Sequence, residues 1–380
     1  MYKFRYILLL SFLLINESFF INTLRLNKKN TIISLQLYKY EKEYIDFYNK
    51  FKDPVLSLGD NNDSENSFIE KNKNSYLIFE RNIDYIEYSN IIFKQNNDTL
   101  VLGLNQFADE IDFSNDINND LMKYTINKNT IIKNYSNTFL KPFKKPFFYM
   151  NKIIKQSQSH NWNNTDYLSP VKNQGKCGSC WAFSTTSSVE TFMRIKNYTV
   201  DRLSEQELID CSIENNGCSG GIMHKALDYI IKNKGLHANK DFPYNGKDNN
   251  CTKLAEIPKI IGSNISDYEF IIPKSPLDIM ISVTKTPIAL GLDANNFYFR
   301  FYKEGVIDVP SNFSKTLNHA VLLVGYDYDE SGFYWIIQNS WGETWGDNGF
   351  CKIRIKDGLD NEGSLMCQVY GVYPTNKIIK

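Results

Sequence analysis

The segment Gln174–Phe183, with the sequence QGKCGSCWAF, limits the possible structures of this chain more than any other stretch. The apolar residues after Cys180 can continue as a buried helix, which places this thiol at a helix N-terminus. The positive end of a helix dipole lowers the pKa of a thiol and favours the nucleophilic thiolate. Gln174 lies six residues upstream, close enough to fold back and donate a hydrogen bond to an oxyanion. The segment therefore predicts a nucleophilic cysteine.

A cysteine nucleophile needs a base that a third group holds in place. His319 begins an expected strand over residues 320–326, and Asn339 ends the next expected strand over residues 333–338. Adjacent antiparallel strands can bring the start of one beside the end of the other. An amide oxygen can then accept a hydrogen bond from one imidazole nitrogen and leave the other facing the thiol. The sequence predicts a triad of Cys180, His319 and Asn339.

These motifs resemble the active-site signatures of the papain and cathepsin family of cysteine proteases. The 139-residue separation of His319 from Cys180 agrees with that family. The resemblance implies peptide-bond hydrolysis through a thiolate–imidazolium pair and an acyl-enzyme. The backbone N–H of Cys180 and the side chain of Gln174 would stabilise the oxyanion. Trp341 would cover the hydrogen bond between the histidine and the asparagine.

Two other interpretations of Cys177-x-x-Cys180 are possible. A thioredoxin-like redox pair requires a preceding βαβ pattern, which we do not find. A zinc site of Cys177, Cys180, Cys211 and Cys218 would leave three cysteines unexplained. We therefore expect no metal and no cofactor. The remaining histidines, His160, His224 and His237, lack a catalytic context and are expected to be ordinary surface or cleft-edge residues.

The order of the expected elements predicts the fold class. Helices come first in the last 225 residues, including residues 226–231 and a capping box at Ser204 and Glu207. Strands follow at residues 288–292, 320–326, 333–338 and 350–355, which predicts an α+β fold. The resemblance implies a papain-like two-lobe fold, with a helical left lobe, an antiparallel β-barrel-like right lobe and a cleft between them.

A small helical unit is expected before this domain. Residues 40–51 and 75–93 have helical apolar spacing, and Phe79, Asn82, Ile86 and Asn90 share one helical face. With the pattern G-x-N-x-F-x-D at Gly103–Asp109, these residues resemble the inhibitory prodomain of cathepsin-L-like proteases, although Lys71 and Ser75 replace its usual Glu and Arg. We expect a prodomain with linker over residues 22–155 and the protease domain over 156–380. Acid is expected to release the prodomain by protonating carboxylates such as Asp109.

Residues 1–21 are expected to be a signal peptide or signal anchor. Lys3 and Arg5 precede an apolar run over Tyr6–Ile15. That run is shorter than the roughly 20 residues that cross a bilayer as a helix. The secretory pathway, leading to a lysosome, an acidic vacuole-like compartment or secretion, is the expected location.

The seven cysteines allow three disulfides and one free thiol. Resemblance to the family implies the pairs Cys177–Cys218 and Cys211–Cys251. The remaining pair would be Cys351–Cys367, which departs from the family pattern because the third bridge there normally uses a cysteine shortly before the catalytic histidine.

Substrate recognition follows from the resemblance. The substrate-binding residues would be Gly220, Gly221, Ile222, Met223, Gly291, Leu317, Asn318, Ala320, Trp341 and Tyr370. The floor of the pocket for the P2 side chain (the second residue before the scissile bond) would be Tyr370 or Val372, neither of which is acidic. An apolar P2 residue is therefore expected. No loop that would block one end of the cleft is evident, so we expect an endopeptidase.

The expected partners are protein or peptide substrates, the chain's own prodomain and inhibitors of the cystatin type. The 43 basic and 43 acidic residues give no net charge, which does not favour nucleic acid as a partner. We expect a monomer. A pseudoprotease used for binding and an aminopeptidase of the same fold are the alternatives.

Overall fold

The computed structural model describes residues 40–52, 68–69, 71–110, 159–251, 259–260, 265–310, 314, 316–356 and 362–376. The expected signal segment 1–21 and most of the expected linker lie outside these residues. Among the described helices, none is long and apolar enough to cross a membrane.

The N-terminal unit, residues 40–110, is built on helices α2 (Glu41–Phe51) and α4 (Lys73–Gln95). Tyr44 and Phe79 are fully buried where the helices meet, with their rings 5.1 Å apart. On the expected face of α4, Asn82 donates to the Ala108 carbonyl at 2.8 Å, and Asn90 donates to the Leu102 carbonyl at 2.9 Å. These contacts confirm the predicted helices and give a structural reason for the pattern on α4: it holds the segment that contains residues 103–109.

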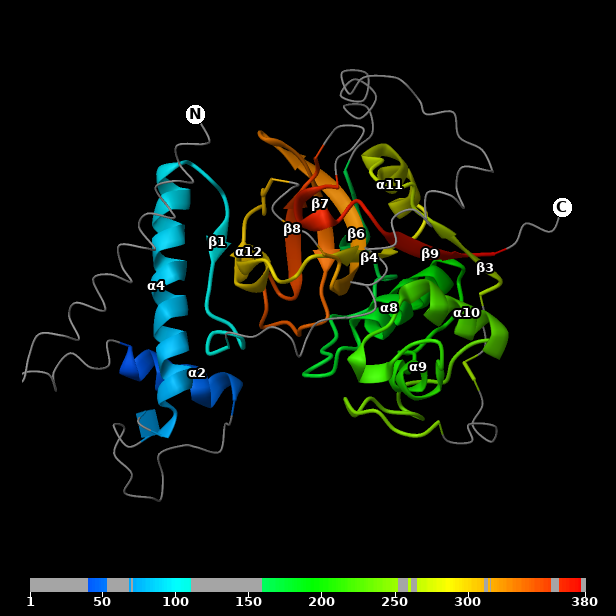
Figure 1. Cartoon of the computed structure of the whole chain (residues 1–380). Helices are drawn as coiled ribbons and strands as arrows, with labels where there is room; N and C mark the ends of the chain where they lie inside the picture. The colour runs from blue at the N-terminus through cyan, green and yellow to red at the C-terminus, as the bar shows by residue number, and fades with distance from the viewer. Residues whose placement is uncertain are drawn as a thin grey trace, which may run out of the picture.

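Figure 1 shows α4 and β1 (Val101–Leu102) beside α12 (Phe297–Arg300). Strand β1 pairs antiparallel with β5 (Tyr302–Glu304), which joins the N-terminal unit to the rest of the molecule. The segments that contain β1 and β5 approach closely at Gly305, which has a φ of 88°. A Cβ there would lie 1.8 Å from the Thr99 carbonyl oxygen. Glycine is required at this contact for both reasons.

The first half of the C-terminal domain is helical. Its elements are η3 (Trp162–Asn164), α8 (Cys180–Ile195), α9 (Glu205–Cys211), η4 (Gly217–Ser219) and α10 (Met223–Asn233). Helix α8 is almost entirely buried, because other helices cover one side of it and the sheet covers the other. Ser204 caps α9 by accepting from the Glu207 amide at 3.0 Å. The capping box predicts that the Glu207 carboxylate reaches back to Ser204. The carboxylate instead binds the buried His237.

The second half is an antiparallel sheet with the order β3-β9-β4-β6-β7-β8. Strand β2 (His160–Asn161) pairs with β6 beside this path. The other strands are β3 (Asp267–Phe270), β4 (Ile288–Leu292), β6 (His319–Asp329), β7 (Gly332–Gln338), β8 (Phe350–Arg354) and β9 (Gly371–Thr375). Helix α11 (Pro276–Val283) and η6 (Ser364–Met366) lie among them in sequence. The α+β class and the four expected strands are confirmed, whereas β2, β3, β5 and β9 were not anticipated.

Two hydrophobic clusters divide the core. One contains α8 together with residues of α9 and α10, and the other contains the inner residues of β6, β7 and β8. The second cluster also contains Tyr44, Phe79 and Phe107 of the N-terminal unit. The N-terminal unit therefore shares an apolar core with the strand half of the domain.

The cysteines confirm two of the three expected pairs. Cys177 is bonded to Cys218 and Cys211 to Cys251. The expected pair Cys351–Cys367 is wrong, because neither sulfur forms a disulfide. Both thiols lie in the apolar core, where burial raises the pKa of Cys367 to about 12 and raises that of Cys351 as well. Because the thiolate is the species that reacts, this burial protects both thiols from oxidation.

Alkylation of the unfolded, non-reduced protein should therefore modify Cys180, Cys351 and Cys367. The reason is that the two confirmed disulfides protect the other four cysteines. Peptide mass spectrometry with and without a reductant checks this. Modification of Cys180 alone before reduction would contradict this prediction and would show that Cys351 and Cys367 form a disulfide.

Candidate active site

Cys180 is the first residue of α8, as expected, and is completely buried in this structure. The helix is fixed against the sheet by two serines on its inner face. Ser184 donates to the Val321 carbonyl at 2.7 Å, and Ser188 donates to the Pro287 carbonyl at 2.7 Å. These bonds hold the helix that carries the thiol beside β6, the strand that carries His319.

His319 and Asn339 meet as the strand order predicts. His319 begins β6, Asn339 follows β7, and these strands pair antiparallel, with Leu322 opposite Gln338. His319 Nε2 lies 2.8 Å from Asn339 Oδ1. Within the described residues, His319 Nδ1 is buried and makes no hydrogen bond. The ring can therefore bind the amide through one nitrogen and use the other for proton transfer.

The environment of His319 keeps the imidazole neutral. Burial lowers its pKa to about 4, the hydrogen bond to Asn339 opposes the shift, and the charge of Arg300 adds to it. The closed structure therefore binds a proton at His319 less readily than an exposed imidazole does. The thiolate–imidazolium pair expected from the sequence requires a less buried ring.

Trp341 covers His319. The two rings are 4.7 Å apart at an interplanar angle of 32°, and Phe299 approaches the imidazole from another side at 6.1 Å. Trp341 is 3% exposed. The aromatic rings exclude water from the His319–Asn339 hydrogen bond, as expected, and so strengthen it.

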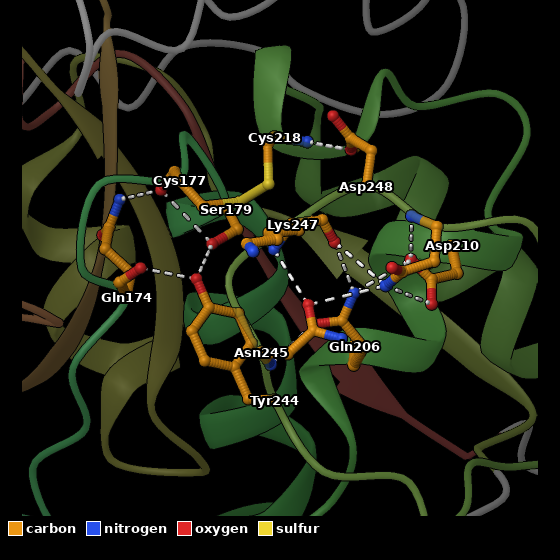
Figure 2. The surroundings of a disulfide bond; sticks show 12 residues. Gln174, Cys177, Ser179, Gln206, Asp210, Cys218, Tyr244, Asn245, Lys247 and Asp248 are labelled. Atoms are coloured by element: carbon orange, nitrogen blue, oxygen red, sulfur yellow. Dashed lines mark hydrogen bonds between the residues drawn. A yellow bond between two sulfur atoms is a disulfide. The ribbon is translucent and has the colours of Figure 1, made fainter.

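Gln174 is held in place by neighbours from both halves of the domain. Its Oε1 accepts from Ser340 Oγ at 2.6 Å, and its Nε2 donates to the Cys177 carbonyl at 3.0 Å. Figure 2 shows this second bond beside the disulfide of Cys177 and Cys218, with the Tyr244 hydroxyl donating to the Gln174 carbonyl. The disulfide thus anchors the loop that positions the glutamine.

The two glycines of the expected substrate wall, Gly220 and Gly221, are required for different structural reasons. Gly220 has a φ of 121°, which a side chain would strain. A Cβ on Gly221 would lie 2.6 Å from the Trp181 indole. Glycine at position 221 therefore preserves the packing of α8, in addition to any contact with a substrate.

The two residues expected for the floor of the P2 pocket lie in different places. Tyr370 lies against Gly291, since a Cβ there would lie 3.4 Å from Tyr370 Cδ1 and 3.5 Å from Leu317 Cδ1. Val372 instead lies within β9, between β3 and β4. The Tyr370 hydroxyl is 3.0 Å from His224 Nδ1, and burial lowers the pKa of His224 to about 4. No motif in the sequence connects His224 with Tyr370.

The other expected substrate residues surround the same site. Ile222 and Met223 lie at the start of α10, and Ala320 pairs with Gly291 across β6 and β4. Asn318 has a structural role, because it accepts from the Ala294 amide at 2.7 Å and donates to Asp293 at 2.8 Å.

The N-terminal unit lies directly over the Trp341 side of the site. The Phe107 ring is 4.8 Å from the Trp341 ring, and Gln106 Nε2 donates to the Trp341 carbonyl at 3.0 Å. Arg300 is buried beneath Phe107 and Glu110. No motif in the sequence points to Arg300, although an arginine within the aromatic run of residues 297–302 is an unusual signal.

The described residues contain no group of histidine, cysteine, aspartate and glutamate side chains that could hold a metal ion. The zinc alternative is excluded, because three of its four cysteines are in disulfides.

The arrangement is compatible with a thiol hydrolase, and comparison with known proteins identifies the family. The model of the papain family cysteine proteases matches residues 156–372, so the chain belongs to this family. The senescence-specific cysteine protease SAG12 of Arabidopsis thaliana is 34% identical over 81% of this chain and 85% of its own length. Mouse cathepsin J is 42% identical over 51% of this chain and 59% of its own length.

Solved precursors share the arrangement of both parts. The stem bromelain precursor has a TM-score of 0.66 at 28% identity, covering 87% of this chain and 99% of its own. Procathepsin L2 of Tenebrio molitor has a TM-score of 0.67 at 27% identity, covering 88% and 99%. The protein is a papain-like cysteine protease in its zymogen form, and the N-terminal unit is its inhibitory prodomain.

Replacing Gln174 with alanine should lower kcat of the activated enzyme by roughly 100-fold with little change in KM, because one oxyanion donor is lost. The variant S340A should have a smaller effect in the same direction, since Ser340 only orients the glutamine. Hydrolysis of a blocked peptide, normalised by active-site titration, measures both. An equal kcat in wild type and Q174A would exclude the glutamine from the oxyanion site.

Proposed function

We propose that the protein is a cysteine endopeptidase that cleaves peptide bonds through Cys180, His319 and Asn339. The observation that carries the proposal is the 2.8 Å bond between His319 and Asn339. His319 begins β6, and the Ser184 hydrogen bond fixes the helix of Cys180 to this same strand. Three elements hold the three residues, and aromatic rings shield the hydrogen bond between two of them.

The reaction would proceed in two halves. The Cys180 thiol gives its proton to His319 Nδ1, its sulfur attacks the substrate carbonyl, a C–S bond forms, and the carbonyl π electrons move to the oxygen. The Cys180 amide and the Gln174 side chain stabilise that oxyanion. His319 then gives its proton to the leaving amine as the C–N bond breaks. In the second half His319 takes a proton from water, which attacks the acyl-enzyme and releases the acid and the thiolate.

The substitution C180A should abolish hydrolysis of blocked peptides without unfolding the protein, because alanine fills part of the same buried site at the start of α8. In the acid-processed wild type, an epoxysuccinyl thiol inhibitor should form one adduct, on Cys180. Mass spectrometry locates the adduct and circular dichroism checks the fold. A labelled but inactive wild-type enzyme would favour the pseudoprotease alternative.

Removal of the prodomain would make the site competent. We place the signal segment or anchor at residues 1–21, the prodomain with linker at 22–155 and the protease domain at 156–380. The location would be the secretory pathway, ending in a lysosome, an acidic vacuole-like compartment or secretion. The active form would be a monomer that cystatin-type inhibitors can bind.

Acid would favour release through His319. Its pKa is about 4 in the closed precursor, below the ordinary value of 6.5. A group whose pKa is lowered by folding stabilises the folded state above the ordinary value and loses that contribution as the pH falls towards the lowered value. Between pH 6.5 and about 4, protonation of His319 therefore favours an opened site.

Asp109 would act in the opposite sense to our expectation from the sequence. Burial raises the pKa of its carboxyl, although Lys52 lies 2.9 Å away and opposes the shift. A carboxyl whose pKa is raised by folding favours the folded state more as the pH falls, so its protonation does not open the precursor. Glu110 is the carboxylate that crosses to the protease domain, at 2.9 Å from Arg300, so loss of its charge would weaken docking.

The variant E110Q should therefore release its prodomain at a higher pH than the wild type, whereas D109N should not. The background C180A prevents self-cleavage, and a trace of active enzyme added to each precursor reports prodomain release as cleavage on gels. The expected difference reflects the loss of a partly buried ion pair, on the order of a tenfold change in rate. Identical pH profiles for E110Q and wild type would rule out Glu110 as a docking contact.

An apolar P2 residue fits the pocket formed by Gly291, Leu317 and Ala320 with Tyr370 as its floor. The Tyr370 ring lies against Gly291, so it would limit the depth of the pocket, and its hydroxyl lies 3.0 Å from His224 Nδ1. Leucine and valine should therefore be preferred to larger residues. Absence of an end-blocking element in the described residues supports endopeptidase over aminopeptidase action, and cleavage of peptides with a blocked N-terminus distinguishes the two.

The variant Y370A should shift the P2 preference towards phenylalanine, because truncation deepens the pocket. Removal of a large side chain there should change the ratio of kcat/KM for phenylalanine over valine by roughly tenfold. Matched fluorogenic peptides that differ only at P2 measure it, with H224A as the control that loses the hydrogen bond but keeps the ring. An unchanged ratio in Y370A would show that the floor lies elsewhere.

A further inference from the structure

Arg300 is an arginine buried at the boundary between the prodomain and the protease domain. It ends α12 and is 1% exposed. Its carbonyl oxygen accepts from Trp345 Nε1 at 3.1 Å and from Asn105 Nδ2 at 2.8 Å. The bond from Trp345 holds the main chain of Arg300, and so the base of its side chain, on the protease domain, whereas the bond from Asn105 comes from the prodomain.

The guanidinium of Arg300 faces the prodomain. It donates to Glu110 Oε2 at 2.9 Å, and its central carbon lies 3.9 Å from the centre of the Phe107 ring. Glu110 also binds Lys52 through its other oxygen at 3.0 Å. The glutamate and the phenylalanine that cover the guanidinium both belong to the segment that leaves on activation. Activation thus uncovers a fixed positive charge.

The position of that charge identifies the part of the substrate that would meet it. The Arg300 guanidinium lies 6.0 Å from the Trp341 ring, which stacks on His319. In the proposed reaction His319 gives its proton to the leaving amine, so the peptide after the scissile bond lies on the His319 and Trp341 side of the site. Arg300 therefore borders the path of the leaving peptide.

We propose that Arg300 is a specificity residue that binds an acidic side chain within the first three residues after the scissile bond, and that Glu110 occupies its place in the precursor. The inference rests on the proposed endopeptidase function.

The chemistry of the site favours a carboxylate as the ligand. A guanidinium binds a carboxylate through its planar fork of donors, and it keeps its charge at every pH of interest. Phe299, Trp341 and Trp345 form an aromatic wall beside α12, with ring separations of 5.0 to 5.4 Å. Apolar neighbours reduce screening by water, so the pair would be stronger than one on an open surface.

The test uses enzyme processed from the full-length precursor and normalised by active-site titration. Internally quenched peptides carry glutamate or glutamine at one of the three positions after the scissile bond and are otherwise identical. At about pH 6 most glutamate side chains are ionised, since their ordinary pKa is about 4.3. At one position or more, wild type should cleave the glutamate peptide roughly threefold to tenfold faster in kcat/KM.

The variants separate this role from other effects of the arginine. R300Q should lose the glutamate preference and R300K should keep part of it. K285Q, which removes an exposed positive charge between α11 and β4, should keep all of it. Because each preference is a ratio of two substrates on one enzyme, any effect of the charge on His319 cancels. Raising the salt from about 0.05 M to about 0.5 M should reduce the preference in wild type.

Two outcomes would overturn the proposal: no glutamate preference in wild type at any of the three positions, or the same preference in R300Q. A blocked peptide joined to a fluorogenic amine has no residue after the scissile bond and reports the protease activity alone. Its cleavage by an enzyme without glutamate preference would reject Arg300 as a specificity residue and leave the proposed function intact. Failure to cleave it would reject the proposed function itself.

Discussion

The packing of one buried helix against the start of one strand is the contact on which the site depends. Cys180 comes from the helical half of the domain and His319 from the strand half, so neither half holds the chemistry alone. Two serine hydroxyls on α8 donate to main-chain carbonyls of the strand half. Unlike the apolar packing around them, these hydrogen bonds have a preferred direction. They fix the depth and rotation of the helix, and so the direction from which the thiol meets the imidazole.

The prodomain uses the same wall of aromatic rings that shields the histidine. Phe107 of the prodomain packs on Trp341, which stacks on His319, and the burial of this imidazole makes its charged form costly. In the proposed activation, inhibition and acid response would thus share a physical origin. The burial that excludes substrate would also disfavour the protonated imidazole, so a lower pH would oppose this burial. The Glu110–Arg300 pair adds a second contact that depends on charge at the edge of the same cover.

The sequence predicted those parts of the molecule in which local pattern and chemistry coincide. The nucleophile helix, the four strands around His319 and Asn339, and the face of α4 all follow from periodicity or from a motif with a physical requirement. The contacts it missed join residues far apart in the chain. Arg300 meets Glu110 across 190 positions, His224 meets Tyr370 across 146, and Glu207 turns to His237 because that imidazole is buried beside it. The number of cysteines also suggested a third disulfide, Cys351–Cys367, which does not form. Two thiols in an apolar core need not be oxidised.

The contact at Gly305 sets different demands before and after maturation. In the precursor, a side chain there would meet both an unfavourable backbone angle and the carbonyl of Thr99, but the carbonyl departs with the prodomain. An alanine at this position would therefore disturb assembly of the zymogen more than it disturbs the finished protease. The mature protease would therefore keep a glycine whose closest neighbour has left with the prodomain, so this position reflects the needs of the precursor and not those of catalysis.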